Sequence, residues 1–159
     1  MANDPEEGNS LRQDSIVMGA LAGLVGNLAK EVIVWPMYFL GWLHYPFVYL
    51  AASYFVDRSS IHNPLSLAKG FITDYAIAAI LGVVLLYLLR YTGKDYALIK
   101  GLLLGLFVHI GIYGLLMAFH ATRISILTPL PNLLLVVPHV VFGTATAWVL
   151  KRYWNPQRV

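Results

Sequence analysis

Long apolar runs alternate with short polar segments along most of this chain. The first run covers residues 15–56 and is broken by two charged residues, Lys30 and Glu31. A helix needs about 20 mostly apolar residues to cross a bilayer, so the pattern predicts transmembrane helices and no soluble core. Four spans are expected, at residues 15–42, 68–91, 97–120 and 131–152.

Residues 43–56 allow two interpretations. They are apolar enough for a fifth span, but Gly41, His44 and Pro46 interrupt the pattern. The stretch is also rich in Trp and Tyr, which favour the headgroup level of a membrane. We therefore expect a short interfacial or re-entrant helix here.

Composition agrees with a membrane protein. Hydrophobic residues make up 58% of the 159 residues and charged residues 12%, whereas a soluble domain carries about 25% charged residues. The sequence thus predicts an all-α polytopic membrane protein with one four-helix transmembrane domain over 15–153. A polar, disordered N-terminus (1–14) and a short tail (154–159) are expected to flank it, both cytoplasmic. The N-terminus is acidic, unlike the basic start of a cleavable signal peptide.

The basic residues predict the orientation. One set of loops holds Arg90, Lys94, Lys100, Lys151, Arg152 and Arg158, and the other holds Arg58, Lys69 and Arg123. Because Lys and Arg accumulate on the cytoplasmic side, both termini should be cytoplasmic. The net charge of +3 is explained by this distribution at helix ends, so we do not expect nucleic acid as a partner.

Each predicted helix carries small residues at a spacing of four that lead to a polar residue. The four sets are Gly19, Gly23, Asn27 and Glu31; Asp74, Ala78 and Gly82; Gly101, Gly105 and His109; and His139, Gly143 and Ala147. Residues four apart share a helix face, and small residues let helices approach closely in lipid. Ionisable residues in a span face the bundle interior or a wet cavity. The four faces are therefore expected to meet, tightly on the cytoplasmic side and more loosely outside.

The polar ends of these faces predict a pocket or a buried polar network. Its members would be Asn27, Glu31, Asp74, His109 and His139, with Lys30 at its rim or paired with Glu31 or Asp74. One interpretation is a site for a proton, an ion, a headgroup or a cofactor. The other is a structural network that fixes helix register. The residues alone leave both open.

Two histidines raise the question of haem. His109 and His139 are expected on adjacent antiparallel helices at similar depth, so they could be axial ligands of haem b, and the small residues beside them would leave room for a porphyrin. No Arg that could bind the propionates lies nearby in the sequence. Other chemistry has little basis. The chain has no cysteine, no metal-binding motif, and none of the common catalytic signatures, so neither a metal site nor an enzyme is expected.

Three stretches carry a resemblance. "GALAGLVGNLAKEVIVWP", "KGLLLGLFVHIGIYGLL" and "PHVVFGTATAWVLKR" resemble an uncharacterised family of small four-span integral membrane proteins of Gram-positive, spore-forming bacteria. This resemblance implies a short amphipathic helix after the first span and a location in the bacterial cytoplasmic membrane. It implies no activity.

Function is expected to rest on the helix faces, since the loops are short. The first hypothesis is a non-enzymatic subunit, scaffold or assembly partner, in a homo-oligomer or with other membrane subunits. The second is a small transporter or channel component that uses the polar pocket. The third is a haem-binding electron-transfer subunit.

Overall fold

The computed structural model describes residues 15–124 and 128–154. The predicted terminal segments 1–14 and 154–159 lie outside this part, apart from Trp154. Within it the chain is all-α, without strands, and four helical segments are long and apolar enough to cross a membrane. This confirms the predicted four-span architecture. The segments are Ser15–Phe39, Pro64–Thr92, Ala97–Ala118 and Pro129–Tyr153.

The first two spans are single helices, whereas the last two are interrupted. The helices are α2 (Ser15–Phe39), α3 (Phe47–Ala52), η1 (Arg58–Ser60), α4 (Pro64–Thr92), α5 (Ala97–Phe107), η2 (Val108–Tyr113), α6 (Gly114–Ala118), α7 (Pro129–Leu134) and α8 (Val136–Tyr153). The third span contains a π-helical turn, η2, between α5 and α6. The fourth breaks at Leu135, because Pro138 has no N–H to donate to the preceding turn.

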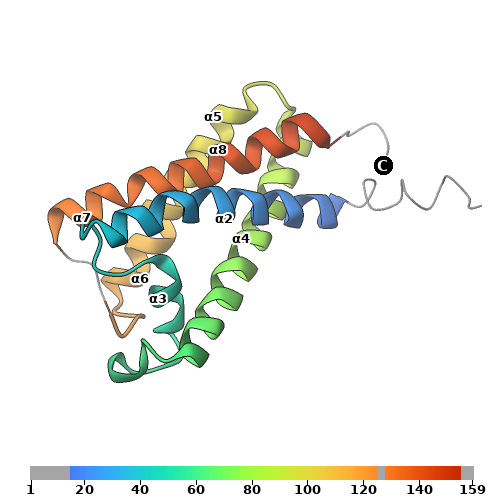
Figure 1. The fold of residues 1–159 in the computed structure, drawn as a ribbon. Helices are drawn as coiled ribbons and strands as arrows, with labels where there is room; N and C mark the ends of the chain where they lie inside the picture. Colours follow the sequence, from blue (N-terminus) through green and yellow to red (C-terminus); the bar gives the residue numbers. More distant parts are fainter. Residues whose placement is uncertain (1–14, 125–127, 155–159) are drawn as a thin grey trace, which may run out of the picture.

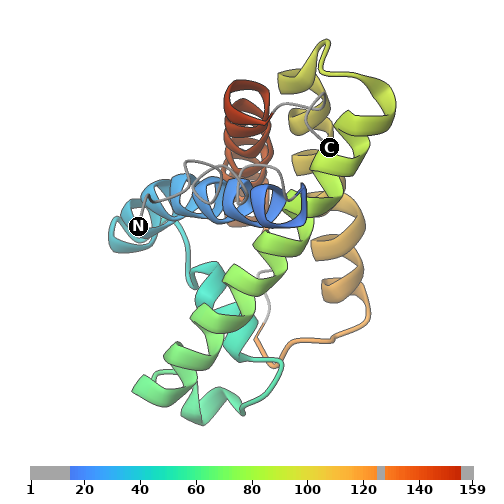
Figure 2. The same cartoon turned by 90° about the vertical axis from the view of Figure 1, so that its right-hand side faces the viewer.

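The spans pack in the spatial order α4, α2, α8, α5. Helix α2 contacts both α4 and α8, and α5 packs mainly on α8, whereas α4 and α5 touch little. The start of α2, the end of α4, the start of α5 and the end of α8 lie at one end of the molecule (Figures 1 and 2). We call this end the terminal side and the opposite end the far side. The helices diverge toward the far side.

Glycines bring the helices close at two separate crossings. A Cβ at Gly23 would overlap the carbonyl of Ala78, and one at Gly82 would overlap the carbonyl of Gly19. At the other crossing, Gly101 and Gly143 approach each other's carbonyl oxygens in the same way. Backbone contact this close requires glycine, as in other tightly packed membrane helices.

The remaining predicted small residues belong to the same crossings. Gly105 meets the His139 carbonyl, and the Ala147 side chain lies against Gly101. The small-residue faces therefore meet in pairs, α2 with α4 and α5 with α8, and do not converge on one shared axis. A third close approach, of Gly26 to Thr146 and Phe142, joins α2 to α8.

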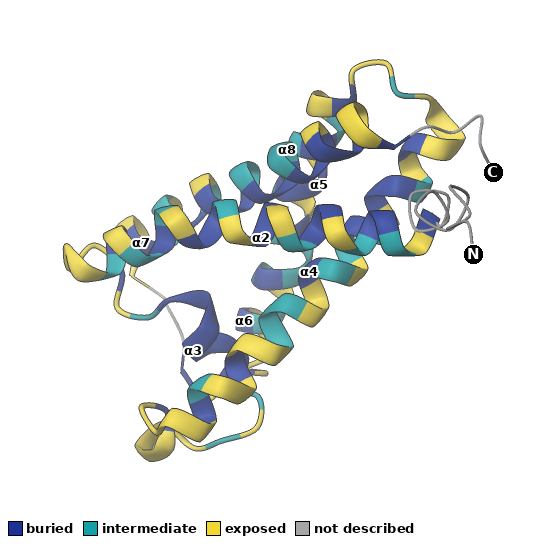
Figure 3. Cartoon of the chain, turned by 45° about the vertical axis from the view of Figure 1, so that its right-hand side comes forward, coloured by how far each residue is buried: buried dark blue, intermediate teal, exposed yellow. Residues whose placement is uncertain are grey.

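The short helix α3 fills the space between the diverging helices. All of its residues are buried (Figure 3), and Gly70 lets α4 approach the carbonyl of Val48. A short helix follows the first span as predicted, but it covers only Phe47–Ala52 of the predicted 43–56 and is buried within the protein; residues 43–56 contain no fifth span. Helix α3 is thus part of the protein interior on the far side.

Candidate functional site

The centre of the candidate site is a buried ion pair between α2 and α4. The Lys30 ammonium donates to both carboxylate oxygens of Asp74, each at 2.8 Å. Asn27, one turn before Lys30, donates from Nδ2 to Asp74 Oδ2 at 2.7 Å. Lys30 and Asn27 are 5% and 1% exposed. Asp74 therefore holds two residues of α2 in place from a neighbouring span.

Glu31 adds a second carboxylate to the same ammonium. Its Oε1 lies 3.2 Å from Lys30 Nζ, and neither of its oxygens accepts a well-formed hydrogen bond from any residue that the structure describes. Two carboxylates thus share one cation at a buried position. If both are ionised, this group carries one excess negative charge, which is costly in a low-dielectric interior.

His139 lies near this group on α8. Its Nδ1 is 2.7 Å from the carbonyl oxygen of Leu135. A carbonyl can only accept, so Nδ1 donates, and in the neutral ring Nε2 then keeps a lone pair. Phe47 separates His139 from Lys30: its ring centroid is 4.8 Å from that of His139 and 4.6 Å from Lys30 Nζ.

His109 contacts His139 but does not line the cavity. The two rings are in edge contact, with centroids 5.0 Å apart, and His109 stacks on Tyr113 at 5.4 Å. Axial ligation of haem would require a porphyrin between the two imidazoles, and rings in direct contact leave no such space. We therefore do not pursue the haem hypothesis.

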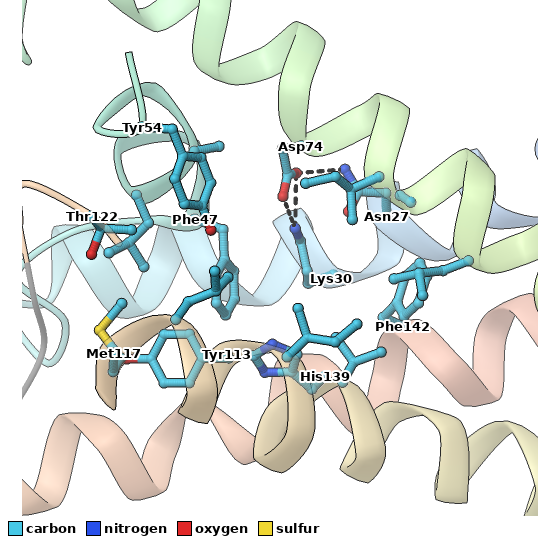
Figure 4. A pocket seen from close by; sticks show the side chains of 18 residues that line it. Asn27, Lys30, Phe47, Tyr54, Asp74, Tyr113, Met117, Thr122, His139 and Phe142 are labelled. Atoms are coloured by element: carbon cyan, nitrogen blue, oxygen red, sulfur yellow. Dashed lines mark hydrogen bonds and ion pairs between the residues drawn. The ribbon is translucent and has the colours of Figure 1, made fainter. Parts of the chain in front are cut away.

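A cavity of about 100 Å³ lies beside the ion pair. Figure 4 shows Lys30, Asp74 and Asn27 on one side of it, with Phe47, Tyr113 and His139 nearby. Most other lining residues are aliphatic and come from α3, α4, η2 and α6, including Leu50, Ile77, Ala78, Leu81, Val108, Ile112, Leu116 and Met117. The cavity is thus polar at one end and apolar over the rest.

Partly exposed lining residues lie on α4 (Ile77) and on the η2–α6 segment (Ile112 and Leu116), so the cavity is least covered between these two. Ile77, on its α4 wall, is 40% exposed, and α4 makes little contact with η2 or α6. In a membrane this side of the cavity would face the acyl chains. A ligand could therefore reach the polar end of the cavity from the lipid phase.

The structure brings together most of the residues that the sequence indicated. Asn27, Lys30, Asp74 and His139 line the cavity, while Glu31 and His109 contact members of this group from outside the lining. Sequence reasoning missed the aromatic and helical parts of the site. Phe47 and Tyr54 come from the α3 region, and Tyr113 comes from η2.

The π-helical turn had no clear sequence signal. Turns of this type occur often at functional sites, and η2 places Val108, Ile112 and Tyr113 on the cavity wall. The Tyr113 hydroxyl is buried without a hydrogen-bond partner among the described residues. Those residues also contain no cluster of His, Asp or Glu arranged to hold a metal ion.

Comparisons with protein-family models, curated proteins and solved structures find no match to this chain. The resemblance to small bacterial four-span proteins therefore stays a prediction.

Proposed function

We propose that this multi-pass membrane protein is non-enzymatic and binds a small ligand in the lateral cavity, as a small transporter or channel component. The observation that carries the proposal is a charged, buried group at the polar end of a cavity that is least covered between α4 and the η2–α6 segment. Ionisable residues inside a membrane are expensive and generally functional. A purely structural ion pair would be expected to be packed on all sides.

The depth of the ion pair supports this proposal. Lys30 lies nine residues before the end of α2, which places it about 14 Å along the helix from that end. This is near the middle of a hydrocarbon core about 30 Å thick. A binding site at that depth can be approached from either side of the membrane as the helices move.

We propose the orientation with the terminal side in the cytoplasm, in a bacterial cytoplasmic membrane. Arg90, Lys94 and Lys100 flank the α4–α5 connection there, and Lys151 and Arg152 end α8. The positive-inside rule supports this arrangement. The cavity then lies toward the outer half of the bilayer.

Cysteine accessibility tests the proposal, because the natural chain has no cysteine. Ala51 lines the cavity and Ala22 is fully buried in α2 without lining it. Transport requires that A51C react with a small membrane-impermeant thiol reagent added to either face of sealed vesicles. A22C should stay unreactive.

The two negative results have different meanings. Reaction of A51C from one face only would exclude transport but retain binding. No reaction of A51C with any reagent, including a small neutral one, would refute the cavity as a ligand site. Tyr96, which is 77% exposed in the α4–α5 connection, provides the reactive control as Y96C.

A second candidate is the subunit or assembly partner expected from the short loops. The observation in its favour is that α4 makes little contact with the η2–α6 segment. A helix of another copy or of another subunit could pack between them. Oxidation of I77C in native membranes tests this. A disulfide-linked species would place a partner at this position, whereas an exclusively monomeric product would argue against a second copy there.

A further inference from the structure

The hydrogen-bonding groups of the cavity specify the class of ligand. We propose, on the basis of the function above, that the cavity binds an amphiphilic primary or secondary ammonium ion. Its N–H groups would face Asp74 and its alkyl part would leave between α4 and the η2–α6 segment.

The donors closest to Asp74 are already engaged, whereas the Tyr113 hydroxyl on the cavity wall has no partner among the described residues. Lys30 Nζ donates to both oxygens of Asp74, and Glu31 Oε1 lies 3.2 Å from it as an ion-pair partner. Asn27 donates to Asp74, and His139 Nδ1 donates to the Leu135 carbonyl. An anionic ligand at this end of the cavity would lie beside the Asp74 carboxylate, which repels it.

Acceptors, by contrast, remain. Asp74 has lone pairs beyond those used by Lys30 and Asn27, and in its neutral form His139 has an unpaired Nε2. His139 is 6% exposed and lines the cavity, and the described residues offer Nε2 no hydrogen bond. A ligand that donates hydrogen bonds therefore fits this end of the cavity.

Charge favours the same ligand. Two carboxyl groups, Asp74 and Glu31, lie beside the single Lys30 ammonium, so this end of the cavity holds one more acidic group than basic groups. The aromatic rings of Phe47, Tyr54 and Tyr113 line the cavity, and aromatic faces attract ammonium groups. Phe47 already has Lys30 Nζ at 4.6 Å from its ring centroid.

Size determines that the ligand is amphiphilic. A cavity of about 100 Å³ is smaller than the engineered cavity of about 150 Å³ that accommodates benzene. It can hold an ammonium head with a few carbon atoms. The rest of the molecule must pass between α4 and the η2–α6 segment, where the surroundings in a membrane are apolar.

Charge-selective labelling of A51C tests this inference in nanodiscs of neutral lipid. The probes are two thiol reagents of similar size, 2-aminoethyl methanethiosulfonate, which is a primary ammonium, and 2-sulfonatoethyl methanethiosulfonate, which is an anion. At A51C the cationic reagent should react about tenfold faster or more, because a carboxylate attracts one and repels the other. The ratio of the two reaction rates at Y96C gives the difference in intrinsic reactivity between the reagents, against which the ratio at A51C is compared.

Protection provides an independent measurement on the protein with its ion pair intact. Octylammonium should slow labelling of A51C by a small neutral reagent, methyl methanethiosulfonate. Octanol, which lacks the charge, and octyltrimethylammonium, which lacks N–H donors, should protect less. D74N should abolish both the charge preference and the protection, while D95N, in the exposed α4–α5 connection, should change neither.

The outcomes separate this inference from the proposed function. If A51C reacts with the neutral reagent but shows no cation preference or no protection by octylammonium, the ligand class is wrong and the cavity remains a site. If A51C is inert to all three reagents, the cavity is not a ligand site and both proposals fail. Should D74N disturb the fold, reactivity of A22C in that background would reveal it, and the protection experiment on the Asp74 protein still decides.

Discussion

Replacing Asp74 and Glu31 one at a time and then together measures how Lys30 is held. In D74N, Lys30 keeps the Glu31 carboxylate, now 3.2 Å away, and the new amide can still accept from Asn27. We expect a loss of about 1–2 kcal/mol of unfolding free energy, because Lys30 loses its nearer counter-charge and the bond from Asn27 now joins two neutral groups. E31Q removes only the longer contact of Lys30, which keeps Asp74, and should cost about 1 kcal/mol or less.

The double variant should be far less stable than these values suggest. With neither carboxylate present, a Lys30 ammonium that is 5% exposed has no counter-charge. Breaking a buried ion pair in this way costs about 3–5 kcal/mol. The coupling between the two substitutions should therefore be about 1–3 kcal/mol, within the range seen for residues in one network.

Reversible unfolding in mixed micelles with increasing denaturing detergent, followed by the fluorescence of the four tryptophans, gives the required free energies. A triple variant that adds K30M should regain most of the loss, because an uncharged group of similar volume needs no counter-charge. Additive effects of D74N and E31Q, or no recovery on adding K30M, would refute the sharing of one ammonium by two carboxylates.

Three other predictions concern the scaffold. G82V should destabilise the protein by about 3 kcal/mol or prevent folding, because its side chain meets the α2 backbone. The control is I80A, at a position 64% exposed, which should change the unfolding free energy little. In whole cells an impermeant thiol reagent should label F55C, on the far side, but not Y96C, on the terminal side; the reverse pattern would invert the proposed orientation. G70L should push α3 away from α4 and speed labelling of A51C, and an unchanged rate would show that this contact does not position α3.

The architecture could be predicted from the sequence because lipid imposes a strong length rule. Each apolar run had to become a helix of at least about 20 residues, and interruptions at Gly41 and Pro46 indicated where the first one ends. The close crossings also followed from spacing, since Gly19, Gly23, Gly101 and Gly105 recur every four residues. The predicted convergence on one axis was less accurate, because spacing fixes a helix face but not the helix that covers it.

The site was only partly predictable for the same reason. Ionisable residues within apolar runs are conspicuous, so Lys30 and Asp74 could be identified and paired by charge. Nothing in the spacing of Phe47 or Tyr113 indicates that they line a cavity, since aromatic residues occur throughout the chain. The π-helical turn that positions Tyr113 depends on tertiary packing, which local propensity does not describe.

The ion pair between α2 and α4 also constrains how the chain enters the membrane during synthesis. A charged residue near the centre of a span disfavours insertion by about 2.5–3.5 kcal/mol, and α2 contains two of them, Lys30 and Glu31. Asp74 follows Lys30 by 44 residues, which at about 5–20 residues per second is a delay of a few seconds. The first span is therefore expected to wait at the translocon until the second emerges, so that both partition into lipid as a hairpin with the intervening α3 segment folded between them.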